Sequence, residues 1–361
     1  MKRRTRTLLI ASIVLLVVAA VAIAVALRRR EAPEPARLLP EADAVIYVNA
    51  KTIRRLTSFG EKPATPREPE YEEFVRETGF QFERDLDEAA VAIHTAQTPA
   101  NRAPENRYSE IFVGRFNAER GAAYLQKISQ TVERYREVNI YNIPVENRIV
   151  RAAIVGMDTV AVSNTEGTQA IHGMIDRYKQ MALPFGGPAL LREHYRDVPF
   201  ASLVWAIVRV PEKPSDPRQS RSLTLPGGFD VFIPQNSVMV ASARFTGTIH
   251  ARIDLIAQTD QDAAKFSEQA GTFLELFRAL EGNTAASGTD PDVKAVFDSL
   301  KIVQEGPKAT LSATIPLAFF KKILSEPPVE LSPQPKSDAA EKPKKEPKVK
   351  GKAQRKPKER K

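Results

Sequence analysis

The sequence predicts an α+β protein in which a largely antiparallel sheet carries helices on one face, preceded by an N-terminal transmembrane helix. Three observations support this prediction. Residues 8–27 form one uncharged apolar run, short segments of the middle region alternate apolar and polar residues, and segments with apolar residues at helical spacing lie between them. Helices on one face of an antiparallel sheet bury both kinds of apolar surface. The folded part of about 300 residues is large enough for one large or two ordinary domains.

The first segment, residues 1–30, is expected to be a membrane anchor with basic flanks. Leu8 to Leu27 holds no charge, and 13 of its 20 residues are Leu, Ile or Val. Twenty helical residues extend about 30 Å, the thickness of a bilayer core. A cleavable signal peptide is the alternative, because small residues such as Ala20 and Ala22 resemble a cleavage site. The length of the run and the arginines that follow it favour an uncleaved anchor.

The charges around this segment predict its orientation. Four Lys or Arg residues and the free amine precede it, whereas three arginines follow it. The positive-inside rule then places the N-terminus in the cytoplasm and the bulk of the chain outside. We therefore expect a single-pass protein of the cell membrane with an extracytoplasmic body.

The first α+β half is predicted over residues 38–182. Its apolar alternation indicates strands, and its apolar residues at helical spacing indicate helices between them. The expected strands are 44–49, 88–95, 108–116, 139–143, 148–154 and 159–163, and the main helices are 71–78, 117–135 and 164–178. Asn117 is expected to cap the helix that follows it.

The second α+β half is predicted over residues 188–325, after the chain-breaking sequence MALPFGGP. The expected strands are 201–210, 236–245, 248–257, 301–304 and 309–314, and the main helix is 261–280. Both halves run from strands into helices in a similar order, and a shift of 141 residues places Ala122-Ala123 on Ala263-Ala264. This suggests two duplicated halves, although any α+β chain repeats strand–helix units by chance.

The two ends of the chain carry the positive charge. The net charge is +9, of which residues 1–30 supply +7 and residues 331–361 supply +8, so the middle region carries −6. Residues 326–361 are rich in Lys and Pro and poor in apolar residues, which predicts a disordered polybasic tail. Such a tail would contact an anionic surface or polymer, or simply add solubility. An acidic body argues against a nucleic-acid-binding groove.

No catalytic, cofactor or metal site is predicted. The chain has no Cys, which excludes thiolate chemistry. No His pair has zinc spacing, and no GxGxxG, GxxxxGKS or GxSxG motif is present. Acid pairs near Asp85 and Asp260 lie where a strand and a helix begin, and are interpreted as structural. The candidate binding face is the polar side of one strand, formed by His250, Arg252 and Asp254, while the residues between them are apolar.

Four segments resemble an uncharacterised bacterial family of membrane-anchored or secreted α+β proteins. They read LLPEADAVIYVNAKTIR, FVRETGFQFERDLDEAAVAI, EIFVGRFNAERGAAYL and TVAVSNTEGTQAIHGMIDRY, within a likeness that covers residues 38–325. Members open on Leu-Pro-x-x-Ala before the first strand; here Leu39-Pro40 is followed by Ala42 and Ala44. The resemblance implies compartment and architecture, and it assigns no activity or site residue.

The leading functional hypothesis is a membrane-anchored, non-catalytic binding or scaffolding module. The first alternative is an enzyme with an unrecognised site in the body, which a deep pocket lined by His94, His250 or acidic side chains would favour. The second is a cytoplasm-facing protein whose tail binds nucleic acid. The sequence specifies no ligand, partner or oligomeric state.

Overall fold

The computed structural model describes residues 31–57, 69–95, 106–180, 186–211, 222–225, 229–284 and 291–319. These residues belong to one compact unit. The predicted anchor, residues 1–30, and the predicted tail, residues 326–361, lie outside the described residues. Within the described ranges, no helix is long and apolar enough to cross a membrane.

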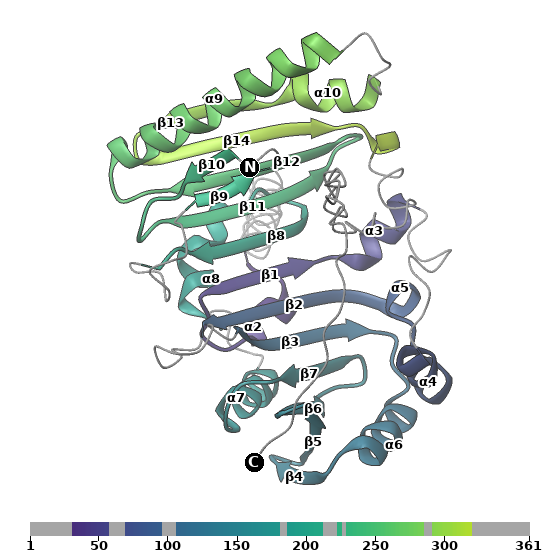
Figure 1. The fold of residues 1–361 in the computed structure, drawn as a ribbon. Coiled ribbons are helices and arrows are strands. Elements are labelled where there is room, and N and C mark those ends of the chain that lie inside the picture. The colour runs from purple at the N-terminus through teal and green to yellow at the C-terminus, as the bar shows by residue number, and fades with distance from the viewer. Residues whose placement is uncertain are drawn as a thin grey trace, which may run out of the picture. The chain divides into compact units, whose positions relative to one another are not determined.

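The body is built on a 12-stranded sheet in which all neighbouring strands are antiparallel (Figure 1). From one edge to the other the strands are β13 (Lys301–Glu305), β14 (Lys308–Ile315), β12 (Ile249–Ile256), β11 (Val238–Phe245), β8 (Ser202–Arg209), β1 (Ala44–Val48), β2 (Leu86–Thr95), β3 (Asn106–Gly114), β7 (Thr159–Ser163), β6 (Arg148–Ile154), β5 (Val138–Val145) and β4 (Thr131–Tyr135). A separate hairpin pairs β9 (Ser222–Leu225) with β10 (Phe229–Phe232). The predicted α+β class with a large antiparallel sheet is confirmed.

Strands β1 and β8 join the two predicted halves in the middle of this sheet. Tyr47 on β1 lies opposite Trp205 on β8, and the two rings stack with centroids 5.5 Å apart. Outward from β1 the order is β2, β3, β7, β6, and outward from β8 it is β11, β12, β14, β13. The strand order is therefore the same on both sides over these positions, and the β1 side continues with β5 and β4. Duplication of an ancestral half stays a prediction.

Helices cover both faces of the sheet, so the prediction of helices on one face is wrong. They are α2 (Glu34–Leu38), α3 (Ala50–Leu56), α4 (Pro69–Thr78), α5 (Phe82–Asp85), α6 (Ala118–Ile128), α7 (Gln169–Lys179), α8 (Ala189–His194), the 3-10 helix η1 (Tyr195–Asp197), α9 (Asp260–Thr284) and α10 (Pro291–Ser299). The physical reason is that successive side chains of a strand point to opposite faces, and β3 is apolar on both.

On the first face, Ile111 of β3 is fully buried in one core with Tyr47, Trp205 and residues of α2, α7 and α8. On the second face, the adjacent Phe112 lies near residues of α4 and α6. The second face also carries Leu255, which is buried against Ala263 and Phe266 of α9.

The region after α6 departs from the prediction. The helix expected over 117–135 ends at Ile128, and Thr131–Tyr135 forms β4. The β-branched Thr131 and Val132 favour a strand, and Arg136 and Glu137 have positive φ values of 45° and 67°, which suit a tight hairpin into β5. The predicted cap is confirmed, because the Asn117 side chain accepts a hydrogen bond from the Arg120 backbone N–H.

Candidate functional site

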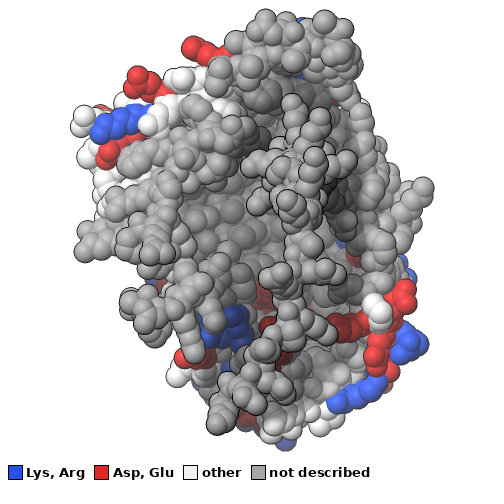
Figure 2. All heavy atoms as spheres, viewed as in Figure 1, with Lys and Arg blue, Asp and Glu red and all other residues white. Residues whose placement is uncertain are grey.

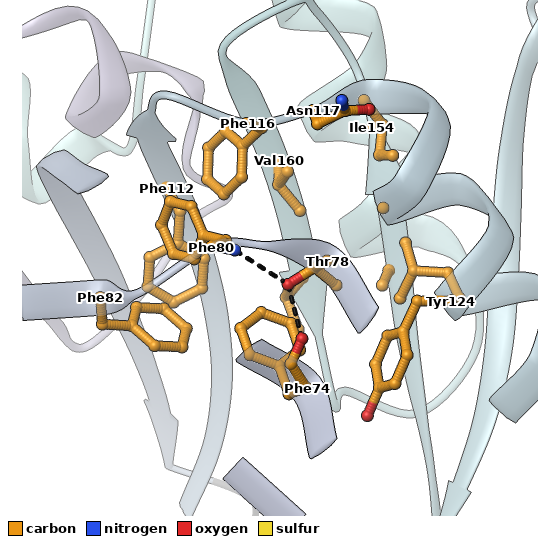
Figure 3. A pocket seen from close by; sticks show the side chains of 14 residues that line it. Phe74, Thr78, Phe80, Phe82, Phe112, Phe116, Asn117, Tyr124, Ile154 and Val160 are labelled. Atoms are coloured by element: carbon orange, nitrogen blue, oxygen red, sulfur yellow. Dashed lines mark hydrogen bonds between the residues drawn. The ribbon is translucent and has the colours of Figure 1, made fainter. Parts of the chain in front are cut away.

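An apolar cavity of about 160 Å³ lies between the second face of the sheet and helices α4, α5 and α6 (Figure 3). We call it the aromatic cavity. Rings from four separate segments surround it, and aliphatic side chains of β6 and β7 form its floor. Its lining residues are Phe74, Thr78, Phe80, Phe82, Phe112, Phe116, Asn117, Gly121, Tyr124, Leu125, Ala152, Ile154, Val160 and Val162.

The rings are held by one another. Phe80 stacks on Phe116 with centroids 4.4 Å apart and meets Phe82 edge-on at 5.1 Å. Phe74 stacks on Phe82 at 5.8 Å and meets Tyr124 edge-on at 5.5 Å. Each such pair adds roughly 0.5–1.5 kcal/mol beyond the area that it buries. The wall of the cavity is therefore a connected aromatic cluster.

Thr78 fixes the turn that carries Phe80 into this cluster. Its hydroxyl donates to the Phe74 carbonyl at 2.7 Å and accepts from the Phe80 N–H at 3.1 Å, as the dashed lines in Figure 3 show. Gly79 follows in the left-handed region, with φ of 76°, and its N–H bonds to the Val75 carbonyl. This closes α4 in the manner of a glycine-terminated helix. The hydroxyl of Thr78 is thus engaged.

Two cations of α6 hold α4 in position over the cavity. Arg120 donates to the Arg76 and Glu77 carbonyls at 2.7 and 2.8 Å, at the C-terminal end of α4. Lys127 pairs with Glu73 and Glu77 at 3.0 and 2.9 Å. Figure 2 shows acidic and basic side chains side by side on the surface in this region. Exposed pairs contribute little stability each, but together they fix the helix orientation.

A close backbone contact sets the positions of Phe112 and Phe116 on either side of Gly114. A Cβ on Gly114 would lie 2.5 Å from the carbonyl oxygen of Asp85, so only glycine fits there. Burial alone would raise the pKa of the Asp85 carboxyl, but hydrogen bonds from Arg84 and the Gln81 N–H and the charge of Arg115 hold that pKa below its ordinary value. This carboxyl therefore has a structural role, as the sequence indicated.

The wall of the aromatic cavity is almost entirely apolar. Among its lining residues the only titratable group is the phenol of Tyr124, whose pKa is raised by burial and by Glu73 nearby. The side chain of Asn117 is engaged as the cap of α6. Because most of this wall consists of aromatic rings and aliphatic side chains, the cavity can exclude water and hold an apolar group.

The sequence pattern did not predict this cavity. Of the 17 phenylalanines, five fall between residues 74 and 116, and this clustering was the available signal. Helical spacing placed Phe74 on a helix face, but nothing in the local pattern brings the Phe80 turn against β3. That contact depends on the β2–β3 pairing and on the close approach at Gly114.

A second cavity, of about 290 Å³, contains two of the three predicted candidate residues, His250 and Arg252. We call it the basic cavity. It lies on the first face of the sheet, where cationic and hydroxyl side chains gather. Its lining residues are Pro199, Ser242, Arg244, His250, Ala251, Arg252, Ser299, Lys301, Ser312, Ala313 and Thr314.

The third candidate, Asp254, does not line this cavity. It is 1% exposed and accepts hydrogen bonds from Arg252 Nε at 2.9 Å and from Thr310 Oγ1 at 2.6 Å. Lys308 Nζ lies 3.2 Å from its carboxylate and 3.5 Å from that of Asp197 in η1. The carboxylate of Asp254 is therefore buried, makes all of these contacts within the protein, and holds the guanidinium of Arg252 through Nε.

His94, which the enzyme hypothesis named with His250, lies elsewhere. Its Nε2 is 3.0 Å from Ser109 Oγ, and that hydroxyl is 3.1 Å from Ser163 Oγ. A histidine–serine pair suggests nucleophilic catalysis, but Ser109 is fully buried. Burial also lowers the pKa of His94. We interpret the chain of hydroxyls as a buried polar network that joins β2, β3 and β7.

In the described ranges, no group of three His, Asp or Glu side chains is arranged to hold a metal ion. Glu110 on β3 is a separate, half-buried acid, and this partial burial raises the pKa of its carboxyl. It lies outside both cavities.

No family model and no curated protein matches the chain. Among solved structures, crystal form III of TP0453 is similar at 10% identity, with a TM-score of 0.46, over 81% of this chain and 98% of that one. Crystal form IV of TP0453 is similar at 12% identity, with a TM-score of 0.41, over 82% and 98%. Likenesses this distant carry no functional argument. The findings agree with the resemblance to a family without an assigned activity.

Proposed function

We propose that this protein is a non-catalytic binding module whose aromatic cavity takes up an apolar group the size of one aromatic ring. The observation that carries the proposal is the cavity wall, which combines five phenylalanine rings with aliphatic side chains. A dry apolar cavity of about 150 Å³ in another protein binds benzene. The 160 Å³ found here is close to that size.

The arrangement of polar groups supports binding rather than chemistry. The Thr78 hydroxyl at the wall is engaged as donor and acceptor, and the Asn117 side chain caps α6. A polar ligand would therefore lose its hydrogen bonds to water on entering, at a cost of roughly 1–3 kcal/mol per unsatisfied group. An apolar ligand meets no such cost.

Thermal unfolding with ring-sized probes tests the proposal. The full-length protein in non-ionic detergent would be titrated with benzene and with pyridine, which has the same shape and one hydrogen-bond acceptor. At ten times its dissociation constant, benzene should stabilise the native state by about 1.4 kcal/mol. Pyridine should stabilise it less. If benzene fails to raise the unfolding temperature more than pyridine does, the cavity is not an apolar binding site.

A matched pair of glycine variants localises the effect. A Cβ on Gly121 of α6 would lie 3.4 Å from Ile154 Cδ1 inside the cavity, whereas a Cβ on Gly271 of α9 meets nothing within 4 Å. Gly121→Leu should fill the cavity and abolish the response to benzene, and Gly121→Ala should weaken it. Gly271→Leu should leave it unchanged. An equal response in Gly121→Leu would place the benzene elsewhere.

The anchor completes the proposed function. We propose that residues 1–30 anchor the protein in the membrane, because the uncharged run Leu8 to Leu27 and its basic flanks favour a single membrane pass with the body outside. The polybasic tail, residues 326–361, would then meet an anionic surface or polymer. Deleting residues 1–30 should release the protein from membranes without detergent. Recovery of a mature chain that begins near Leu27 would show a cleaved signal peptide instead.

A further inference from the structure

The basic cavity lies on the opposite face of the sheet from the aromatic cavity. Directly paired residues of neighbouring strands project to the same face. Ser242 is paired with Trp205, which is paired with Tyr47 and belongs to the first-face core. Phe112 of the aromatic cavity projects to the second face. The two cavities are therefore separate sites, and a ligand in the basic cavity would bind independently of the aromatic cavity.

Strand register arranges the lining residues in two rows across the sheet. Both rows consist of cations alternating with hydroxyl groups or a histidine. One row runs through Ser242, Arg252, Ser312 and Lys301, and the other runs through Arg244, His250 and Thr314. Three permanent cations and a histidine thus face one hollow of about 290 Å³.

The positive charge of this hollow is not neutralised by its own residues. No carboxylate lines it. Asp254 pairs with Nε of Arg252, which leaves the two terminal amino groups of that guanidinium for another acceptor. Across the described ranges, no acidic side chain lies within ion-pair distance of Arg244 or Lys301. Cations gathered without a counter-charge repel one another, and a bound anion would relieve that repulsion.

The hydroxyl groups supply the neutral donors that an oxyanion needs. Neither Ser242 Oγ nor Ser312 Oγ has a hydrogen-bond partner in the part of the chain that the structure describes. Ser242 is 9% exposed, so its hydroxyl has little access to bulk water apart from the cavity. Ser299 differs, because its hydroxyl bonds to the Val296 carbonyl and accepts from the Thr314 N–H. Two unengaged hydroxyls therefore stand beside Arg252 in one row.

We propose that the basic cavity binds a phosphate group, with Arg244, Arg252 and Lys301 supplying charge and Ser242 and Ser312 donating hydrogen bonds. Arginine presents a planar fork that suits tetrahedral oxyanions, and charge-assisted hydrogen bonds are about twice as strong as neutral ones. A hollow of 290 Å³ also leaves room for an organic group attached to the phosphate. The phosphate belongs either to a soluble phosphomonoester or to a lipid headgroup.

Calorimetric titration of the full-length protein in non-ionic detergent tests this proposal. The soluble arm uses inorganic phosphate and glycerol phosphate, and the lipid arm uses detergent micelles that contain phosphatidic acid. The variants are Arg244→Gln, Lys301→Gln and the double variant, and both side chains are exposed enough to change without unfolding the body. The control is Arg134→Gln, which removes an exposed arginine from the far edge strand β4. All proteins keep the same polybasic tail.

The double variant should lose affinity by about ten-fold or more, and the control should stay within about two-fold of the parent. Site-dependent binding of soluble phosphate would identify a soluble ligand, and site-dependent binding to phosphatidic acid micelles alone would identify a headgroup. Affinity should fall with added salt, because the site is partly exposed. If the double variant and the parent bind equally in both arms, the cavity is not a phosphate site. That result would not affect the proposal that the aromatic cavity binds an apolar group.

Discussion

Replacing Gly121 by alanine tests whether the aromatic cavity is open in the folded protein. Two contributions should raise the free energy of unfolding. A Gly-to-Ala change inside a helix is worth about 0.8–1 kcal/mol. The added methyl group would also lie 3.4 Å from Ile154 Cδ1, in ordinary van der Waals contact, and burying one such group is worth about 0.8 kcal/mol. We therefore expect a gain of roughly 1.5–2 kcal/mol.

Gly271→Ala separates these two contributions. Gly271 also lies inside a long helix, but a Cβ there meets nothing within 4 Å. It should gain the helix contribution alone, about 0.8–1 kcal/mol. Urea unfolding can be followed through Trp205, which is the only tryptophan, is 1% exposed and lies in the central strand β8. The difference in the free energy of unfolding between Gly121→Ala and Gly271→Ala measures what the added methyl group gains by packing into the cavity.

Two results would contradict this reasoning. If Gly121→Ala gains no more than Gly271→Ala, the added methyl finds no open apolar volume and the cavity is already closed or filled. If Gly121→Ala is less stable than the parent, α6 packs more tightly on Ile154 than the structure shows. In either case the benzene titration should fail as well, because both depend on the same volume.

Three further changes probe the rest of the body. Burial raises the pKa of Glu110, so the native state loses stability as the pH rises through that pKa. Glu110→Gln should therefore be more stable than the parent at pH 7 and equal to it well below pH 4. Urea midpoints that differ by the same amount at both pH values would refute this. Asp254→Ala should cost about 3 kcal/mol or more, because it removes the carboxylate that pairs with Arg252 and leaves Lys308 with Asp197 alone. His250→Ala should cost less than about 1 kcal/mol, and the reverse order of urea midpoints would make His250 the structural residue. Phe266→Ala should cost about 3–5 kcal/mol in the same assay, since that ring packs on Leu255, and an unchanged midpoint would show that α9 does not cover the sheet.

Local patterns were enough to predict most strands and helices, and long-range pairing was not. Alternation along 248–257 predicts β12, and apolar spacing along 261–280 predicts α9, because both signals are periodic within one element. The pairing of β1 with β8, however, joins Tyr47 to Trp205, which are 158 residues apart in the sequence. No short-range signal specifies that contact, since both strands are buried and either could sit in the interior of a sheet.

The predicted helix through Val132 shows how one period can be mistaken for another. Ala118, Ala122 and Leu125 follow helical spacing, and Val132 and Tyr135 continue it by coincidence. The turn at Arg136 and Glu137 has positive φ values of 45° and 67° although neither residue is glycine, so the hairpin carried no strong sequence signal. Pairing with β5 decides the structure of β4.

The candidate face of His250, Arg252 and Asp254 shows why a period of two cannot separate binding residues from structural ones. Alternation places all three on one face, but burial also varies along the strand. Across the sheet, Asp254 is aligned with Val240 and Ile207, which are both fully buried. Helix η1 also packs near this position, because Lys308 pairs with both Asp197 of η1 and Asp254. Two residues further along, the row of Arg252 passes through Ser242 and opens into the basic cavity. The same strand face therefore supplies a buried anion at one end and cavity-lining cations at the other. Asp254 holds Arg252 through Nε, so the residue that does not touch the cavity orients one that does.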